Sequence, residues 1–484
     1  MSESFSGKDM LTILLIVVTL ISSAGTLFYV TSLSGKLMNV SDDLEGVSGN
    51  LQSVSESVLT LSETTVDIAE KVGAPSPELS ALAERLEAFE EAMEEIRVEP
   101  KEYIVFGRSL AFTGKYTQPA LMAHKGWELW IKLVNENGGI YVKEYGKKLK
   151  VKCIYYDDES DPTTAAELYR KLIEVDKVDL LVGPYASAVN YAVQSIAESY
   201  GYMLPITEGT STELYERGMR YSFMCGPGGV ATYYSYPFME WVGNLPEEDR
   251  PSKVAILAED TAFPISVYEG VIAQSEEFGF EVVHKELYPK GTTDYVPMVS
   301  AAKDAGADLL MCGTYFPDAA GIVRAAKEVD FNPKAILCTV GPTLPEWGSE
   351  LGADGDWIFS SSDWDPGAPT FGNAEMISEM REEYGIDPDY HTARDYACGQ
   401  IMEAAIMAQG TLDNDELLDY ILKTSFDTVI GKLSLGDVGG LTHIAWPPGY
   451  VIVQWQEGEV EVVIPSEVAT ADPAYPTPSW DERT

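Results

Sequence analysis

The stretch "LLVGPYASAVNYAVQSIAESYGYMLPITEGTSTEL" (residues 180–214) contains the same arrangement twice. Each time, a short apolar run ends in a polar turn, and a helix-like segment follows. Short strands that alternate with helices form parallel sheets. In such open α/β sheets, ligands lie beyond the carboxyl ends of the strands. The two turns are therefore the first candidates for a binding site.

The same alternation continues along the chain from residue 103. Strand-like segments such as "EYIVFGRSLAF", "KVAILAED" and "ADLLMCGTY" alternate with helix-like ones, which predicts βαβ units. There are too many units for one small sheet, and we expect a split near "MCGPGG" (224–229). The segment "GYVIVQWQEGEVEVVIP" predicts a pair of strands, and the Pro-rich tail (465–484) predicts disorder.

The first hundred residues have a different character. Residues 10–30 carry no charge, which predicts a transmembrane anchor after a short N-terminal segment (1–9). A cleavable signal peptide is the alternative, but apolar residues resume at 27–30 and favour the anchor. Leu and Val recur at heptad spacing in residues 33–98, which predicts a coiled-coil-like helical stalk and a homo-oligomer. A solvated Ser/Gly-rich linker is the alternative there.

Composition and motifs exclude several classes of function. The net charge of -44 argues against nucleic acid or anionic lipid as a partner. No phosphate-binding loop or nucleophile elbow occurs, and the histidines (His124, His284, His391 and His443) lie far apart in the sequence. We therefore expect no cofactor, no metal site and no catalytic residue.

The two turns have chemistry that suits an anion. A helix N-terminus offers unpaired N–H groups and partial positive charge, and the hydroxyls of Ser187 and of Thr210 or Ser211 can add donors. Helix capping alone would explain one such turn. Two turns from neighbouring units, with Tyr185 and Tyr191 beside one of them, favour a site for a carboxylate.

Several weak motifs in a fixed order carry a resemblance. They include "YYDDESDP", "VDLLVGPYAS", "PITEGTSTELYERG" and "DLLMCGTYFPDAAGIVRAAKE". Over residues 103–464 the chain resembles the leucine/isoleucine/valine-binding proteins of ABC transporters, which have the type I periplasmic binding fold. The resemblance implies an α/β fold with two doubly wound parallel-sheet lobes joined by a three-stranded hinge. Lobe 1 would comprise 103–225 plus 342–430, and lobe 2 would comprise 226–341 plus 431–464.

The resemblance also implies roles for individual residues. Ser187 and Thr210 would hold the α-carboxylate of an amino acid, whereas the backbone carbonyl of Glu208 and the side chain of Asp318 would hold its amine. Phe263 would cover the ligand from the second lobe. Three further residues complete the predicted set: Tyr185, Ser211 and Tyr315.

Glu208 departs from the family pattern, which usually has a small residue there. Its carboxylate could select a ligand with extra positive charge, or it could point away so that only its carbonyl contributes. We favour the outward orientation, because a turn can rotate the side chain into solvent.

The expected function follows from the resemblance. It implies a binding protein, not an enzyme, and the uncharged segment 10–30 predicts a single span that tethers it to the cell membrane with its lobes extracytoplasmic. The protein would deliver an amino acid or related solute to an ABC permease. A ligand-sensing receptor module that acts through a partner is the first alternative, and a membrane-anchored enzyme is the second.

Overall fold

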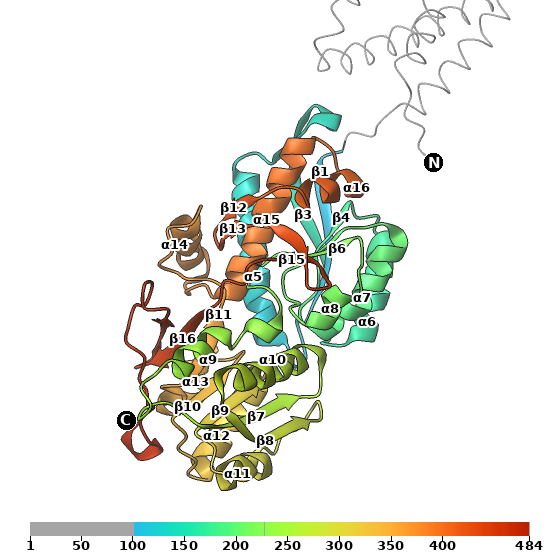
Figure 1. Cartoon of the computed structure of the whole chain (residues 1–484). Helices are drawn as coiled ribbons and strands as arrows, with labels where there is room; N and C mark the ends of the chain where they lie inside the picture. The colour runs from blue at the N-terminus through green and yellow to red at the C-terminus, as the bar shows by residue number, and fades with distance from the viewer. Residues whose placement is uncertain (1–100, 227, 484) are drawn as a thin grey trace, which may run out of the picture. The chain divides into compact units, whose positions relative to one another are not determined.

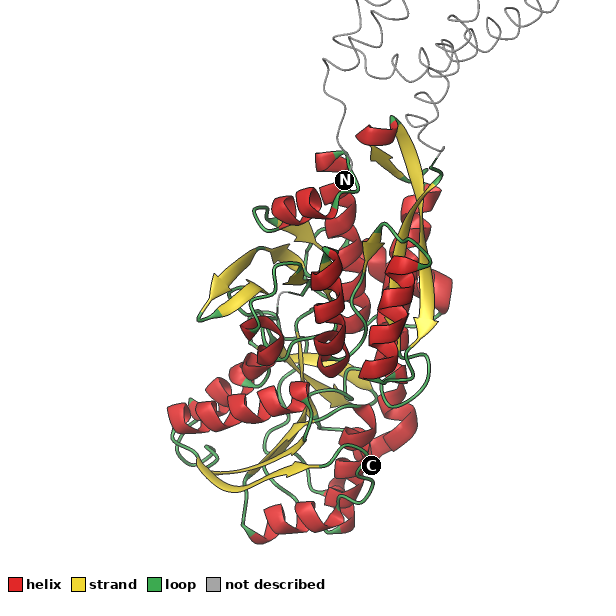
Figure 2. Cartoon of the chain, turned by 90° about the vertical axis from the view of Figure 1, so that its right-hand side faces the viewer, coloured by secondary structure: helices red, strands yellow, loops and turns green. Residues whose placement is uncertain are grey.

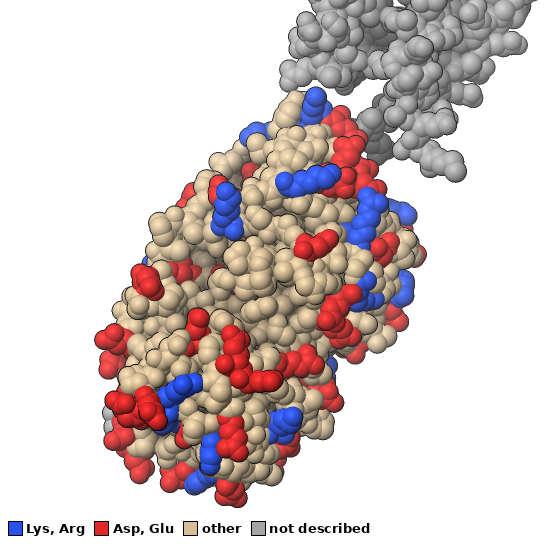
Figure 3. Space-filling model, viewed as in Figure 1, with Lys and Arg blue, Asp and Glu red and all other residues tan. Residues whose placement is uncertain are grey.

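The computed structural model describes residues 101–226 and 228–483, and residues 102–484 cluster as one compact unit. The predicted membrane segment (10–30) and stalk (33–98) lie outside the described residues, so both remain predictions. Within the described part of the chain, no helix combines the length and apolar character needed to cross a membrane. Asp and Glu side chains are spread over the face shown in Figure 3, with fewer Lys and Arg among them, in keeping with the net charge.

Lobe 1 is built on a four-stranded sheet and a separate strand pair. The sheet has the order β2-β3-β1-β4, in which β1 is parallel to both of its neighbours and β2 is antiparallel to β3. Its strands are β1 (Tyr103–Leu110), β2 (Ile140–Val142), β3 (Lys147–Asp157) and β4 (Leu180–Leu181). The parallel pair β5 (Leu204–Ile206) and β6 (Ser222–Met224) lies beyond β4.

Helices cover both faces of this lobe. Figure 1 shows α5 (Thr117–Glu136) and α15 (Tyr390–Gln409) on one side of the sheet, and α6 (Pro162–Glu174) and α7 (Ser187–Tyr200) on the other. The remaining elements of lobe 1 are shorter: α8 (Thr212–Glu216), α14 (Asn373–Tyr384), α16 (Asn414–Ile421), β12 (Phe426–Thr428), β13 (Gly431–Leu433), β14 (Leu435–Val438), β15 (Leu441–Ala445) and the 3₁₀ helix Lys143–Tyr145.

Local sequence signals explain where these elements begin and end. The side chain of Asp161 caps α6 by accepting hydrogen bonds from the backbone N–H groups of Thr163 (2.9 Å) and Thr164 (2.8 Å). Pro162 follows as the first helical residue, where its missing N–H costs no bond. At the other end of a helix, Gly201 closes α7 in the left-handed conformation.

Lobe 2 contains one seven-stranded sheet, in which β16 runs antiparallel to both of its neighbours, β11 and β17. In spatial order its strands are β17 (Glu459–Ile464), β16 (Val451–Gln456), β11 (Phe359–Ser362), β10 (Ala335–Cys338), β9 (Leu309–Gly313), β7 (Lys253–Glu259) and β8 (Glu281–Tyr288). Its helices are α9 (Tyr236–Gly243), α10 (Ala262–Phe278), α11 (Val296–Asp304), α12 (Phe316–Glu328) and α13 (Glu346–Leu351), with 3₁₀ helices at Ala231–Tyr233, Gly352–Gly355 and Trp480–Glu482. Figure 2 shows helices packed around the strands of this lobe as well.

The chain passes between the lobes three times, and two of the crossings differ from the expected positions. The first lies between β6 and the 3₁₀ helix Ala231–Tyr233. The second follows β11, not residue 341, because Phe359–Ser362 pairs with β10 and β16 inside the lobe 2 sheet. The third follows β15, not residue 430, because the β14–β15 hairpin packs on β6 and α8 of lobe 1.

The expectation of a disordered tail is wrong. The backbone N–H of Thr477 bonds to the carbonyl of Lys334 (2.9 Å), and the indole N–H of Trp480 bonds to the carbonyl of Phe331 (2.7 Å). The Trp480 side chain is buried. Burial of this large ring in lobe 2 offsets the entropy cost of ordering a Pro-rich segment.

Candidate ligand-binding site

A small cavity lies between the lobes, at the carboxyl ends of parallel strands. Its volume is about 20 Å³, which is room for a water molecule or two. Lobe 1 and lobe 2 both contribute lining residues: Tyr185, Ala186, Ser187, Glu208, Thr210, Tyr390, His391 and Arg394 from lobe 1, and Tyr234, Phe263, Tyr315 and Val340 from lobe 2. A larger solute therefore enters only when the lobes or the lining side chains move apart.

The turn after β4 is held against the turn after β5. The Gly183 N–H bonds to the Pro205 carbonyl (2.9 Å), and a Cβ at Gly183 would lie only 3.0 Å from that oxygen. Asn190 ties the turn down by donating its amide to the carbonyls of Pro184 (2.7 Å) and Ala186 (3.1 Å). Ala186 itself has a φ of 78°, which is strained for a residue with a side chain. These bonds keep Tyr185 and Ser187 aimed at the cavity.

One hydroxyl joins the two turns. Ser187 Oγ accepts hydrogen bonds from the backbone N–H groups of Thr210 and Ser211, both at 3.1 Å. Because these two bonds use its lone pairs, its proton remains available to donate toward the cavity. Ser187 is also the first residue of α7, so a ligand carboxylate placed here would face a helix N-terminus.

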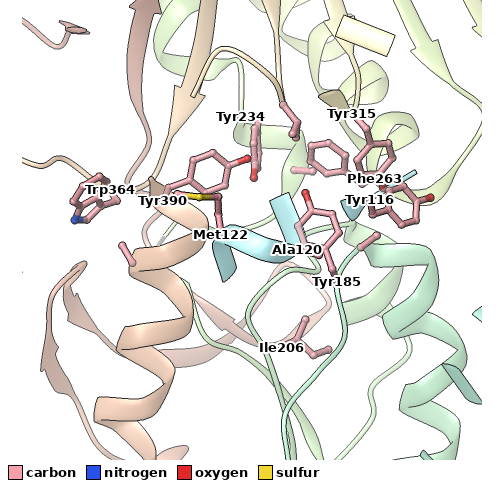
Figure 4. Packing of buried hydrophobic residues seen from close by; sticks show 14 of the residues in the cluster. Tyr116, Ala120, Met122, Tyr185, Ile206, Tyr234, Phe263, Tyr315, Trp364 and Tyr390 are labelled. Carbon is pink, nitrogen blue, oxygen red and sulfur yellow. The ribbon is translucent and has the colours of Figure 1, made fainter. Parts of the chain in front are cut away.

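Aromatic rings form most of the cavity wall. Figure 4 shows Tyr185 of lobe 1 pointing toward the rings of Phe263 and Tyr315 of lobe 2, with Tyr234 and Tyr390 beside them. The centroids of Phe263 and Tyr315 are 5.6 Å apart, and those of Tyr234 and Phe263 are 5.2 Å apart. These are ordinary distances for packed aromatic pairs, so the wall is a continuous aromatic surface.

The charged part of the site is Glu208 with two residues of α15. The Glu208 side chain is 2% exposed, and its Oε2 lies 3.5 Å from Arg394 Nη1 and 3.9 Å from His391 Nε2. His391 Nδ1 lies 2.6 Å from Asp389 Oδ2, and its Nε2 lies 3.2 Å from the Tyr185 hydroxyl. The expected outward orientation of Glu208 is therefore wrong: its side chain turns inward, toward Arg394.

This environment changes the protonation of Glu208. Burial raises the pKa of the Glu208 carboxyl well above its ordinary value, and the carboxylates of Asp395, Asp389 and Asp363 raise it further. Arg394 acts in the opposite direction. The carboxyl therefore holds its proton to a higher pH than an exposed glutamate does.

Six of the eight predicted residues line the cavity, and two do not. The six are Tyr185, Ser187, Glu208, Thr210, Phe263 and Tyr315. The Ser211 hydroxyl instead lies 3.1 Å from that of Ser266 on α10, which links the two lobes. Asp318 lies outside the lining because other groups of the protein already occupy its carboxylate.

Lys115 is the main partner of Asp318. Its Nζ lies 2.8 Å from Asp318 Oδ2 and 3.0 Å from Oδ1, and it also pairs with Glu259. The Tyr295 hydroxyl donates to Oδ1 (2.8 Å), and the Tyr315 backbone N–H donates to Oδ2 (3.2 Å). Since Lys115 belongs to lobe 1 and both carboxylates to lobe 2, this cluster also bridges the lobes.

The sequence did not single out Arg394, His391, Tyr234 or Tyr390 as members of the site. The available signal was "DYHTARD" (389–395), which places several ionisable groups at the start of a helix that the structure buries. A charged side chain that is buried in such a helix requires a partner of opposite charge. The partners of Arg394 are Asp363, which follows β11 at the hinge, and Glu208, which lies in the turn after β5. Among residues 101–226 and 228–483, no group of three or more His, Cys, Asp or Glu side chains could hold a metal ion.

A second, larger hollow lies where α14 faces β16 and β17. It measures about 970 Å³ and is lined by residues that include Trp364, Arg381 and Trp455. Its lining includes neither Ser187 at the N-terminus of α7 nor the pair of Glu208 and Arg394. The small cavity, with its convergent polar groups, is therefore the candidate site.

Comparisons with known proteins agree with this architecture. A family model described as "Periplasmic binding protein" matches residues 104–459. The chain belongs to this family. The resemblance to the Leu/Ile/Val-binding proteins is thereby confirmed. One curated relative, Leu/Ile/Val-binding protein homolog 1 of Brucella abortus, is 25% identical over 362 residues, which cover 73% of this chain and 91% of the relative.

Solved structures of periplasmic binding proteins show the same fold. The branched-chain amino acid transporter substrate-binding protein LivJ of Streptococcus pneumoniae, in complex with isoleucine, aligns with a TM-score of 0.64 at 20% identity, covering 74% of this chain and 97% of that one. A solute-binding protein of an ABC transporter from R. palustris, in complex with 4-hydroxybenzoate, aligns with a TM-score of 0.64 at 19% identity, covering 78% and 99%. The expected α/β fold of two lobes is confirmed, whereas the ligand of this chain is a separate question.

Proposed function

We propose that this periplasmic binding protein captures an amino acid or a closely related small solute between its lobes for an ABC transporter. The observation that carries the proposal is the inter-lobe cavity, where hydroxyls at a helix N-terminus and a buried glutamate–arginine pair face aromatic rings of the second lobe. Such a site has polar ends for a small charged solute and apolar walls for its body. Family membership supports binding rather than catalysis.

A carboxylate fits the end of the cavity at Ser187 and Thr210. The Ser187 proton and the N-terminus of α7 supply a donor and partial positive charge for an anion. The names of curated relatives, which refer to leucine, isoleucine and valine, agree with a small zwitterion.

An aromatic acid is the second candidate. The five aromatic rings around the cavity favour it, and related structures contain benzoate or 4-hydroxybenzoate. The carboxylate of an aromatic acid would bind at the hydroxyls of Ser187 and Thr210. Such an acid has no cationic group that could pair with Glu208.

The setting of the protein in the cell is part of the proposal. The uncharged segment 10–30 would anchor the chain in the membrane, residues 33–98 would act as an oligomeric stalk, and the lobes would present solute to a permease outside the cytoplasm. A receptor module that signals through a partner would need the same ligand site.

A ligand screen tests the proposal. Thermal unfolding of the purified protein would be followed with each of the twenty common amino acids, benzoate and 4-hydroxybenzoate, and each stabilising compound would be measured by calorimetry. We expect at least one compound to bind with micromolar or tighter affinity. If none of them raises the unfolding temperature or releases heat, the proposal fails.

A further inference from the structure

The site has one more carboxylate than it has cations. The three carboxylates are Glu208, Asp363 and Asp389, and the two basic groups are Arg394 and His391. Asp395 also acts on Glu208, but it is paired with Arg108 and leaves the difference unchanged. Even when His391 is protonated, one carboxyl group is left without a cationic partner. Such an imbalance in a buried site favours a bound cation.

The unbalanced carboxylate is that of Glu208. Arg394 already pairs with Asp363, because its Nε lies 2.9 Å and 3.1 Å from the two carboxylate oxygens and its Nη2 lies 2.9 Å from Oδ2. Its remaining contact to Glu208 Oε2 is longer than a hydrogen bond. Glu208 Oε1 is buried and has no hydrogen-bond partner in the described part of the chain. A donor is therefore missing at this oxygen.

The walls beside Glu208 suit a positively charged donor. Tyr185, Tyr234 and Tyr390 line the same cavity, and the faces of aromatic rings attract cations. The Tyr390 ring already has the Arg394 guanidinium over it, at 4.7 Å from the centroid. The rings of Tyr185 and Tyr234 have no such cation among the contacts of the described residues.

The carboxylate of Asp318, by contrast, already forms an ion pair with Lys115. Both of its oxygens lie within 3.0 Å of Lys115 Nζ, and Tyr295 and the Tyr315 backbone complete its bonds. Asp318 also lies outside the cavity lining. A ligand amine would have to displace Lys115 to reach it.

We propose that the Glu208 side chain accepts the cationic nitrogen of the ligand, and that Asp318, paired with Lys115, does not. This inference rests on the proposed function, since it concerns the ligand of the same cavity. It assigns the specificity for an amine to a residue of lobe 1. The ligand class is a small zwitterion with its carboxylate at Ser187 and its amine at Glu208, not a simple aromatic acid.

The test compares matched ligands on matched variants. Calorimetry would measure the binding of each stabilising amino acid and of its counterpart without the amine, for example leucine against 4-methylpentanoate and phenylalanine against 3-phenylpropionate. The proteins are wild type, Glu208→Gln and Asp318→Asn. Both substitutions remove one charge and keep the shape, and the amide introduced by Asp318→Asn retains an oxygen for the Tyr315 N–H. Thermal unfolding of each variant checks that it is folded.

We expect Glu208→Gln to lose roughly thirtyfold or more in affinity for the amino acid, with little change for the counterpart without the amine. Asp318→Asn leaves Lys115 paired with Glu259, and it should change the affinities for the amino acid and for its counterpart by the same factor. The inference is overturned if Glu208→Gln binds the amino acid like wild type, if Asp318→Asn shows the large loss instead, or if wild type binds only acids that lack an amine. Wild-type protein that binds no compound at all contradicts the proposed function itself.

Discussion

At the scale of single residues, Ser187 has two roles in the site. Its hydroxyl oxygen accepts hydrogen bonds from two backbone N–H groups of the turn after β5. Ser187 is also the first residue of α7. The strained φ of its neighbour Ala186 persists because Asn190 and Gly183 hold the turn on both sides. The hydroxyl therefore organises the site and is available to the ligand at the same time.

Removal of that hydroxyl should weaken ligand binding. Ser187→Ala deletes a donor to a charged carboxylate, a bond worth about 1.5–3 kcal/mol, so we expect an affinity loss of roughly tenfold or more in calorimetry. Ser199→Ala is the matched control, because Ser199 lies on the same helix and its hydroxyl bonds to the Ile196 carbonyl, away from the cavity lining. Equal affinities for the two variants would show that Ser187 does not contact the ligand.

The raised pKa of Glu208 predicts that binding of an amine releases a proton. In the free site, burial keeps the carboxyl protonated to a higher pH than usual. A bound ammonium group would stabilise the carboxylate and lower that pKa, so binding should release protons, and affinity should rise with pH until the free carboxyl ionises. Calorimetry in phosphate and in Tris, whose ionisation enthalpies differ, measures the release, and Glu208→Gln should abolish it. Proton uptake, or no exchange in wild type, would contradict this prediction.

At the scale of elements, the C-terminal segment behaves as part of lobe 2. It follows β17, which closes the edge of the sheet, and returns along the lobe to bury Trp480 against Phe331. Gln454 of β16 fastens the segment further, since its side chain bonds to both the N–H and the carbonyl of Ala474. The segment thus contributes to the stability of the lobe, not to the ligand site.

Loss of the Trp480 ring should destabilise the protein. Trp480→Ala removes a buried indole and its hydrogen bond, and we expect a loss of about 3 kcal/mol in the free energy of unfolding by urea. Trp446→Ala is the control, because its side chain is 40% exposed, and it should cost less than about 1 kcal/mol. Ligand affinity should stay unchanged in Trp480→Ala. A Trp480→Ala variant as stable as wild type would show that the tail does not support the lobe.

At the scale of the whole binding unit, few polar contacts hold the lobes together away from the hinge. Lys115 pairs with Glu259 and Asp318 across the gap, and the Ser211 and Ser266 hydroxyls meet beside the cavity. The Lys115 side chain is 15% exposed, so solvent screens this cluster only in part. These contacts favour the closed arrangement of lobes around the small cavity.

Substitution of Lys115 should open the lobes. Lys115→Met leaves two buried carboxylates, Glu259 and Asp318, without their cation from lobe 1, and their mutual repulsion disfavours closure. We expect a larger radius of gyration in small-angle X-ray scattering of the free protein, and a weaker ligand affinity. Lys132→Met is the control, because the ion pairs of Lys132 among the described residues are with three glutamates of its own lobe: Glu136, Glu379 and Glu383.

A second variant separates charge from size in this experiment. The triple change of Lys115→Met, Glu259→Gln and Asp318→Asn removes the repulsion and should restore the wild-type radius of gyration. If Lys115→Met already scatters like wild type, the cluster does not control closure.

The α/β class, the family and most of the turns at the site could be predicted from the sequence alone. Apolar runs such as 180–182 and the helices that follow them are local patterns, and a turn that leads from a strand into a helix places its residues at a sheet edge in any such fold. Ser187, Thr210 and Tyr185 could be predicted for this reason. Phe263 was predicted from the resemblance, because nothing local in the sequence relates it to the first lobe.

Which charges meet depends on the packing of the folded chain. Arg394 and His391 lie almost two hundred residues after Glu208, and only the packing of α15 in lobe 1 brings them to the turn after β5. Lys115 lies two hundred residues before Asp318, and its pairing depends on how the lobes face each other. The same holds for β11 and for the tail, since a short polar strand or a Pro-rich segment becomes ordered only when a neighbouring sheet supplies its hydrogen bonds and buries its side chains.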